Sequence, residues 1–396
     1  MKYHFLLLLS LLFSISVFSE EIYSTTLIKV AKDNPTLGIV AYSGTAPALK
    51  CLRSTLQCCG WFRVLPEKDA KQAQVQLSVR FETQNGYAFQ SHVRTAEGVQ
   101  QIRGASDSLQ KSSYVFTDNL LKELFHVPAL CTKRLAYVMT GSGQMKEIFT
   151  CYLDGTDSQR LTHNNAISTE PFWGGNSKMV YTLARNNALK IILIDLVNNR
   201  QKVVSHGIGL NASASLSPSG KYMALPMSPQ QRVDLYIRDL SSGKAFRLTN
   251  SRNVESSPCW SPDSREICFV SDRTGRPRLY RIGTDGKNFH RMQTGGNEAV
   301  SPDWSSVSNK LCYATRTNSG QYVIAVMDMA KANSVPEFIT PDAGNWEAPS
   351  WAPDGRHIVC TRSAGGFHDL YVLDSWFKRA RVLFRHVNIS LPTWEK

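Results

Sequence analysis

The segment Ser257-Pro258-Cys259-Trp260-Ser261-Pro262-Asp263 is the clearest copy of a pattern that recurs through the last two thirds of the chain. Leu248-Thr249 precedes it, and two apolar runs follow it, Ile267-Cys268-Phe269-Val270-Ser271 and Arg278-Leu279-Tyr280-Arg281. The large apolar residue of the pattern recurs every 43 to 47 residues, at Trp173, Leu216, Trp260, Trp304, Trp351 and Trp394. A period of this length indicates a repeat architecture.

Each repeat is predicted to contain four short antiparallel strands. Pro-x-Trp opens the first strand, and a turn such as Trp351-Ala352-Pro353-Asp354-Gly355 leads into the second. Alternating apolar residues mark the second and third strands, and Leu-Thr marks the fourth. Four strands at a period of about 40 to 45 residues describe a propeller blade. The anchor rings are expected to wedge between neighbouring blades, and six anchors predict six blades.

The last anchor, Trp394, lies two residues before the end of the sequence, so its repeat lacks three strands. We expect these strands ahead of the first anchor, at Arg134–Met139, Glu147–Leu153 and Arg160–Thr162. The strand of Trp394 is therefore predicted to pair with the segment that starts near Lys133, which would remove the open edge of the ring. The propeller is predicted to span residues 129–396.

Residues 20–128 lack the repeat and are predicted to form a small mixed α/β domain. Two predicted helices, Ala48–Gln57 and Ser113–Phe125, carry apolar residues at helical spacing. Strands are predicted at Thr36–Tyr42, Ala73–Glu82, Tyr87–Val93 and Val99–Ile102. The predicted fold is therefore a small mixed α/β domain followed by a six-bladed all-β propeller.

Residues 1–19 are predicted to be an export signal. Met1-Lys2 is a short basic start, and Phe5–Phe13 is apolar apart from Ser10. This run is too short to span a bilayer, which takes about 20 residues. Val17 and Ser19 fit a cleavage site before Glu20. We therefore expect an exported, soluble mature protein.

The charge of the chain is strongly basic and unevenly distributed. The 396 residues include 45 Lys+Arg and 32 Asp+Glu, a formal charge of +13. Residues 20–127 hold 12 basic and 10 acidic residues, so the repeat region carries most of the excess. Export argues against a nucleic-acid partner, and a basic propeller would attract an acidic protein or an anionic envelope surface. A basic surface that is merely solvated is the alternative.

The chain resembles the TolB family, the soluble periplasmic components of the Tol–Pal envelope system. The resemblance covers the domain order and three segments: Ser271-Asp272-Arg273-Thr274-Gly275-Arg276-Pro277-Arg278-Leu279-Tyr280, Lys133-Arg134-Leu135-Ala136-Tyr137-Val138, and Pro35-Thr36-Leu37-Gly38-Ile39-Val40. It implies a monomeric, non-catalytic periplasmic adaptor that supports outer-membrane integrity and cell division and reaches membranes only through its partners. Leu216, at an otherwise aromatic position, departs from the family pattern.

The sequence offers no catalytic or metal-binding motif. It contains no Gly-x-Ser-x-Gly, Cys-x-x-Cys or His-x-x-His. Asp154-Gly155-Thr156-Asp157 lacks calcium-loop spacing and is predicted to be a hairpin turn. Cys268 and Cys312 are interpreted as small core residues, and pairing is left open among Cys51, Cys58 and Cys59. We therefore expect no enzymatic activity, cofactor or metal. The alternative is a secreted propeller enzyme, or a carbohydrate- or ligand-binding propeller, with a site in the central channel.

The long, varied loops of the repeats are the predicted docking site. In a four-stranded meander, the fourth-to-first and second-to-third connections share one face, and varied loops on a rigid scaffold are where recognition residues gather. The resemblance implies that a peptidoglycan-associated outer-membrane lipoprotein (Pal) docks there. The predicted contact residues are His163, Leu210, Asn211, Ser213, Asn253, Glu255, Ser256 and Asn297.

The start of the mature chain is a second predicted interaction site. The resemblance implies that it alternates between docking on the protein's own body and engaging an inner-membrane Tol partner. Residues Glu21, Ile22 and Tyr23 are assigned to this segment, whose mixed polarity would allow it to add a strand to an exposed sheet edge. An ordinary first strand of the domain is the alternative.

Overall fold

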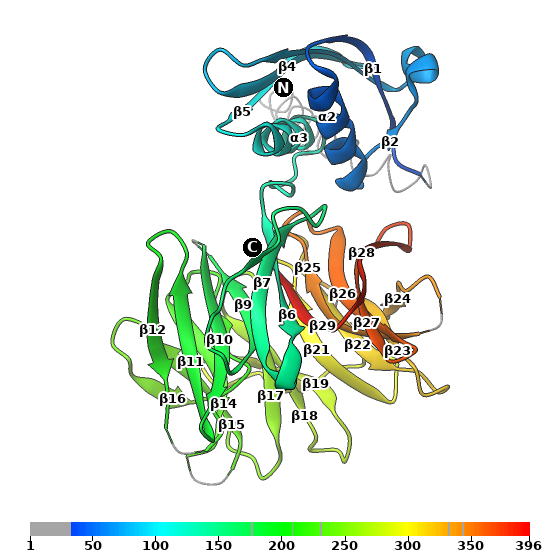
Figure 1. Cartoon of the computed structure of the whole chain (residues 1–396). Helices are drawn as coiled ribbons and strands as arrows, with labels where there is room; N and C mark the ends of the chain where they lie inside the picture. Colours follow the sequence, from blue (N-terminus) through cyan, green and yellow to red (C-terminus); the bar gives the residue numbers. More distant parts are fainter. Residues whose placement is uncertain (1–32, 176, 208, 230–231, 332, 343) are drawn as a thin grey trace, which may run out of the picture. The chain divides into compact units, whose positions relative to one another are not determined.

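The computed structural model describes residues 33–396 except 176, 208, 230–231, 332 and 343 (Figure 1). The predicted signal peptide and the segment of Glu21, Ile22 and Tyr23 lie outside the described residues. The chain divides into two compact units, residues 1–132 and residues 133–396. Among the described residues, no helix is long and apolar enough to cross a bilayer.

The first unit is one mixed sheet with two helices and a 3-10 turn. Its strand order is β2-β1-β3-β4-β5, parallel between β1 and its two neighbours and antiparallel beyond β3. The elements are β1 Thr36–Ser43, α2 Ala46–Cys58, β2 Arg63–Val64, η1 Glu67–Gln72, β3 Val75–Glu82, β4 Tyr87–Thr95, β5 Gly98–Ser106 and α3 Leu109–Phe125. The predicted strands and helices are therefore present, and the sequence reading missed β2 and η1.

Both helices begin earlier than their apolar stripes predicted, because polar residues cap them. The hydroxyl of Thr45 accepts a hydrogen bond from the Ala48 N–H, and that of Ser108 accepts one from the Lys111 N–H. The Asp118 carboxylate in α3 accepts hydrogen bonds from the segment that follows the helix, from the backbone N–H groups of residues 130, 131 and 132 at 2.7–2.9 Å. One buried side chain thereby fixes the segment that leaves this unit.

The second unit is all β apart from a short 3-10 turn, as the repeat predicted. Four of its sheets contain four consecutive antiparallel strands each. Their strands are β13 Ser215–Leu216, β14 Tyr222–Met227, β15 Asp234–Asp239, β16 Ala245–Arg247; β17 Glu255–Trp260, β18 Glu266–Ser271, β19 Arg278–Gly283, β20 His290–Arg291; β21 Glu298–Trp304, β22 Lys310–Arg316, β23 Tyr322–Asp328, β24 Glu337–Phe338; and β25 Asn345–Trp351, β26 His357–Ala364, β27 Phe367–Asp374, β28 Arg379–Val387.

The remaining strands of this unit form one eight-stranded sheet. They are β6 Arg134–Thr140, β7 Lys146–Tyr152, β8 Gln159–Arg160, β9 Ile167–Gly174, β10 Lys178–Arg185, β11 Ala188–Asp195, β12 Arg200–Ser205 and β29 Ile389–Trp394, with the turn η2 Ser142–Gln144. A single parallel pair, Lys146 with Ile167, joins β7 to β9. Without that pair the sheet would be two four-stranded sets, and the count of six blades stays a prediction.

The last strand of the unit pairs with its first. β29 runs antiparallel to β6, with Ile389 opposite Met139 and Trp394 opposite Leu135. The pairing continues past the strand, because the Glu395 N–H donates to the Arg134 carbonyl at 2.9 Å. Segments from the two ends of the repeat region therefore share one sheet, which covers the edge that β6 would otherwise expose.

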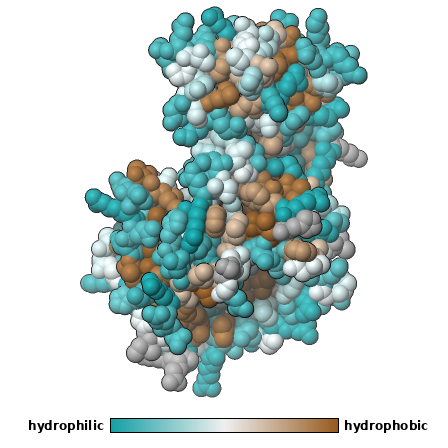
Figure 2. All heavy atoms as spheres, in the orientation of Figure 1, coloured by the Kyte–Doolittle hydropathy of each residue, from teal (hydrophilic) through white to brown (hydrophobic). Residues whose placement is uncertain are grey.

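The anchor residues fill the space between successive sheets. Trp260 lies in one hydrophobic cluster with Leu235 and Ile237 of the preceding sheet, and its indole N–H donates to the Ser215 carbonyl there at 3.1 Å. Leu216 packs on Val180 and Leu193 in the same way. Cys268 and Cys312 are fully buried, which confirms their interpretation as core residues. On the side seen in Figure 2, the hydrophobic areas are small and interrupted by hydrophilic ones.

The fourth strands are shorter than predicted. Strands β8 and β16 end at Arg160 and Arg247, so the Leu-Thr pairs lie just beyond them. The threonine hydroxyl accounts for this, because in Thr162 and Thr249 it accepts a backbone N–H from the third strand at 2.9 and 3.0 Å. The threonine side chain thus takes the place of the next backbone hydrogen bond between the third and fourth strands, and the chain continues into the loop.

Candidate functional site

Because neighbouring strands are antiparallel, the connections of the second unit lie at two opposite ends of its sheets. The connections after each second and fourth strand, with the strand ends beside them, make one end, which we call the loop face. The opposite end, which carries the connections after each first and third strand, is called the turn face. The loop-face connections are 141–145, 161–166, 186–187, 206–214, 228–233, 248–254, 272–277, 292–297, 317–321, 339–344, 365–366 and 388.

Each first strand enters the ring through the same backbone kink. Three residues before each anchor, the chain adopts a positive φ of 49–54°, although none of these residues is glycine. Such φ values cost free energy in residues with a side chain, and they are typical of bulges that re-aim a strand. In five of the six strands the ladder register also shifts at this point. The kinked residues are Glu170, Ser213, Ser257, Ser301, Ala348 and Leu391.

These kinks line a cavity of about 140 Å³ between the first strands. A proline follows each kinked residue except Ser213, which Ala214 follows, so the wall is largely apolar. The Glu170 carboxylate accepts hydrogen bonds from the Ser213 N–H at 2.7 Å, from the Ser213 hydroxyl and from the Thr182 hydroxyl at 2.8 Å. Neighbouring sheets are thus bonded to each other at the cavity wall.

A second cavity, of about 200 Å³, lies beside the anchors, and Asp303 lines both cavities. The Asp303 carboxylate accepts the Trp351 N–H at 2.7 Å, the Ser350 hydroxyl at 3.1 Å and the Lys396 ammonium at 2.6 Å. The negative charge of Asp303 is therefore paired with a cation of the same chain. Ligand pockets typically enclose about 300–1,000 Å³, so either cavity suits a side chain better than a substrate.

The predicted docking residues around the second anchor differ in accessibility. Ser213 is half-buried at the wall of the first cavity, and Leu210 is half-buried beside it on the loop face. Asn211 is only 3% exposed, and its side-chain oxygen accepts a hydrogen bond from the Ser205 hydroxyl at 2.8 Å. Asn211 therefore shapes the loop from within.

In the next repeat the predicted docking residues again differ in accessibility, and the residue equivalent to Ser213 is not one of them. Glu255 is fully buried, and it accepts hydrogen bonds from Thr249 and Arg273. The residue equivalent to Ser213 is Ser257, since both are kinked and line the cavity. Ser256, which was predicted as a contact residue, lies one position earlier. Asn253 and Ser256 are half-buried, as is Asn297 in a later loop, and His163 is exposed.

Acidic and basic side chains are arranged differently on the loop face. Three of its acids are at most 5% exposed and form ion pairs: Glu147 with Arg160, Asp234 with Arg247, and Glu255 with Arg273. Burial raises the pKa of Glu255, although Thr249 and Arg273 oppose the shift. Exposed arginines stand on the same face, at Arg185, Arg232, Arg252, Arg276 and Arg316, of which Arg316 forms an ion pair with Glu298 at 3.3 Å. The loop face therefore presents positive charge to solvent.

The turn face is built from short loops held by aspartates. At the end of β15, the Asp239 carboxylate accepts the Ser241 hydroxyl and the N–H groups of Ser241 and Ser242 at 2.6–3.0 Å, which lowers its pKa to about 2. The same turn follows β11 at Asp195 and β27 at Asp374. These carboxylates satisfy backbone donors of their own loops, so they serve the fold.

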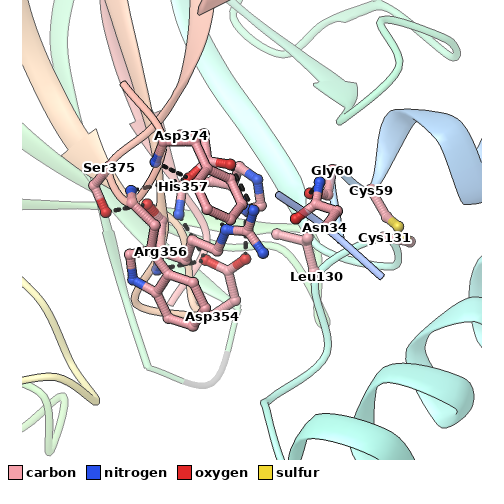
Figure 3. A network of polar contacts seen from close by, with 12 residues as sticks. Asn34, Cys59, Gly60, Leu130, Cys131, Asp354, Arg356, His357, Asp374 and Ser375 are labelled. Carbon is pink, nitrogen blue, oxygen red and sulfur yellow. Dashed lines mark hydrogen bonds and ion pairs between the residues drawn. The ribbon is translucent and has the colours of Figure 1, made fainter. Parts of the chain in front are cut away.

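The last repeat extends this pattern into the network of Figure 3. The Arg356 guanidinium donates to both carboxylate oxygens of Asp374, at 3.1 and 2.6 Å, and Asp354 bonds the His357 ring at 2.6 Å. Burial raises the pKa of Asp354, but His357 and two backbone N–H groups outweigh it and hold this pKa well below its usual range. The turn face is thus stabilised by ionised aspartates.

The described residues supply no metal centre and no recognisable catalytic group. Within them, no three His, Cys, Asp or Glu side chains are grouped so that they could hold an ion. The Ser213 hydroxyl in the cavity donates to Glu170, and serine nucleophiles are usually activated by an adjacent base such as histidine. The loop face and the mouth of the first cavity therefore remain as the candidate site for a macromolecular partner.

Comparison with known proteins decides the family. Residues 124–396 match the family model described as the TolB β-propeller domain. The chain belongs to the TolB family. Related proteins include the Tol-Pal system protein TolB of Desulfosudis oleivorans, 31% identical over 137 residues, and that of Bordetella pertussis, 25% identical over 185 residues. These matches cover 34% and 46% of this chain, and only 31% and 42% of the relatives' own lengths.

Solved structures place the TolB fold on nearly the whole chain. The crystal structure of TolB from Acinetobacter baumannii superposes with a TM-score of 0.81 over 91% of this chain and 96% of that one, at 20% identity. A propeller in the nidogen/laminin complex matches 67% of this chain, with a TM-score of 0.55 at 11% identity. At such low identity, these likenesses show the fold alone, and the loop face must be interpreted from this chain's own residues.

Proposed function

We propose that this TolB-family chain is a non-catalytic periplasmic adaptor of a Tol–Pal system. Its loop face binds an outer-membrane lipoprotein of the Pal type, and the segment of Glu21, Ile22 and Tyr23 binds an inner-membrane Tol partner. The curated relatives named as Tol-Pal system proteins support this assignment. So does the predicted export signal at residues 1–19. The connection would support outer-membrane integrity and cell division.

One observation carries the loop-face half of the proposal. On that face the acids Glu147, Asp234 and Glu255 are buried and paired, whereas Arg185, Arg232, Arg252 and Arg276 are exposed. Exposed positive charge on a rigid scaffold attracts and orients a partner with an acidic surface. Of the eight predicted contact residues, we retain the six with accessible side chains: His163, Leu210, Ser213, Asn253, Ser256 and Asn297.

The test is a capture experiment from detergent-solubilised cell envelope with the full-length protein as bait. Arg252→Glu with Arg276→Glu reverses charge on the loop face, and Lys221→Glu with Lys244→Glu makes the same change on the turn face. We expect the first pair to reduce the captured lipoprotein at least tenfold and the second to leave it unchanged, as quantified by mass spectrometry. Equal capture by both variants contradicts the proposal, and capture of no envelope protein by the wild type favours the ligand-binding alternative.

The N-terminal half has its own test, because it concerns a different partner. Removing residues 20–26 should abolish capture of the inner-membrane partner and leave lipoprotein capture intact. Retention of both partners would assign these residues to an ordinary part of the first domain.

A further inference from the structure

On one face of the sheet of the first unit, η1 packs on β1 so closely that a Cβ at Gly38 would lie 2.2 Å from the Ala70 carbonyl, and the described residues of β3, β4 and β5 present exposed polar side chains beside it. Side chains alternate along its strands, so Leu77, Val79, Phe89, Val93 and Ile102 point to the buried side and their neighbours to the other. On the core side, α3 packs so closely on β5 that a Cβ at Gly104 would lie 2.1 Å from the backbone of Phe116. The opposite side, which we call the open face, carries Arg80, Gln90, His92, Arg94, Gln101 and Arg103.

The open face is polar and basic. Arg80, Arg94, Arg103 and His92 are all exposed. Glu82 is the acid beside them, and it forms an ion pair with Arg80 at 3.0 Å and a hydrogen bond with Gln90 at 3.2 Å. Within the described residues, neither Arg94 nor Arg103 forms an ion pair. Three arginines and one carboxylate leave the face with a net positive charge.

Strand register fixes the spacing of these charges. Arg80 and Arg103 both stand opposite Gln90, on either side of it, so their backbones are about 10 Å apart. Arg94 is four residues further along β4, about 13 Å from Gln90. The amides of Gln90 and Gln101 lie between the arginines. Guanidinium groups on a rigid sheet, with amides between them, suit carboxylates held on an ordered polypeptide.

We propose that the open face is a second docking surface, and that it binds an acidic polypeptide segment. The chemistry of the face disfavours other anions. Among its described residues, the face carries no aromatic ring on which a base could stack, and Val99 is the one exposed large apolar side chain that could anchor in a lipid surface. The free edge of β5 is a poor site for an added strand, because the Asn119 amide already donates to the Arg103 carbonyl at 2.7 Å.

This surface is separate from the loop face, so its test must report where a probe binds. The probe is a synthetic peptide of six Glu-Ser repeats that carries one photo-cross-linking benzoylphenylalanine, and it is irradiated with the full-length protein. We expect cross-links in the tryptic peptides that cover residues 75–106. Arg80→Gln, Arg94→Gln and Arg103→Gln together should reduce these cross-links roughly tenfold, because three charge-assisted contacts are lost.

The matched control removes the same charge elsewhere in the unit. Lys50→Gln, Lys111→Gln and Lys122→Gln, all at exposed positions of α2 and α3, should leave the cross-links within twofold of wild type. Circular dichroism confirms that both variants fold. Cross-links confined to the propeller, or unaffected by the arginine substitutions, overturn the proposal and leave the loop-face assignment standing. Arginine-dependent sedimentation with phosphatidylglycerol vesicles, without peptide cross-links, overturns it in favour of a lipid surface.

Discussion

The two ends of the propeller are made by the same strands, yet they treat their carboxylates in opposite ways. On the turn face, Asp239 and Asp374 are ionised and hold the backbone of short loops. On the loop face, Glu255 is buried against Arg273, and arginines such as Arg252 and Arg276 take the solvent positions. The carboxylates of the turn face therefore stabilise the sheets, whereas the loop face can carry exposed charged side chains for recognition.

The largest effect should come from opening the ring, on which both ends depend. Deleting residues 391–396 removes Trp394 and two of the four residue pairs between β29 and β6. The edge of β6 and the neighbouring core are then exposed, so we expect the cooperative unfolding transition of the propeller to be lost. Thermal denaturation followed by circular dichroism measures this. A truncated protein with an unchanged melting temperature would show that closure contributes nothing.

A turn-face substitution should reduce stability and leave binding intact. Asp374→Ala removes the carboxylate that accepts two hydrogen bonds from Arg356 and caps its own turn. Losing one partner of a largely buried ion pair costs about 3 kcal/mol of unfolding free energy. Urea denaturation gives the loss, and envelope capture should match that of wild type at a temperature where the variant is folded. Reduced capture by the folded variant would break the separation between the two ends.

The smallest effect is a difference in the sign of the pH dependence. Asp354 has a lowered pKa, so its contribution to stability is present above the unfolded value near 3.8 and is lost as the pH falls below it. Glu255 has a raised pKa, so its contribution is present below the unfolded value near 4.5 and is lost as the pH rises through the folded value.

Unfolding free energies measured from pH 3 to pH 7 for Asp354→Asn and Glu255→Gln separate these effects. Relative to each variant, wild type should gain stability with rising pH at Asp354 and lose it at Glu255. The slopes are compared rather than the levels, because Glu255→Gln also leaves Arg273 without its carboxylate. Slopes of the same sign would mean that the two ends are electrostatically alike.

Most of the architecture was predictable because it repeats. Pro-x-Trp and the Pro-Asp-Gly turn recur with the same residue types, so their period indicated the sheets, the anchors and the pairing of β29 with β6. The kink before each proline was not predictable, because residues as different as Glu170, Ala348 and Leu391 adopt it.

The docking residues were only partly predictable for a related reason. Polar residues in variable loops read as solvent-exposed, yet Asn211 and Glu255 are buried, where they accept hydrogen bonds from the side chains of neighbouring residues. The burial of Glu255 could have been inferred from the sequence. Its hydrogen-bond partners are Thr249, in the preceding Leu-Thr pair, and Arg273, in the next hairpin.

Because β29 pairs with β6, the propeller can close only after β29 has been synthesised. The ribosome makes β6 and then about 250 further residues before β29 exists, which at roughly 5–20 residues per second takes more than ten seconds. Throughout that time β6 has one bare edge, and a segment from another chain can add to it. Until β29 pairs with β6, association between copies through this edge therefore competes with closure.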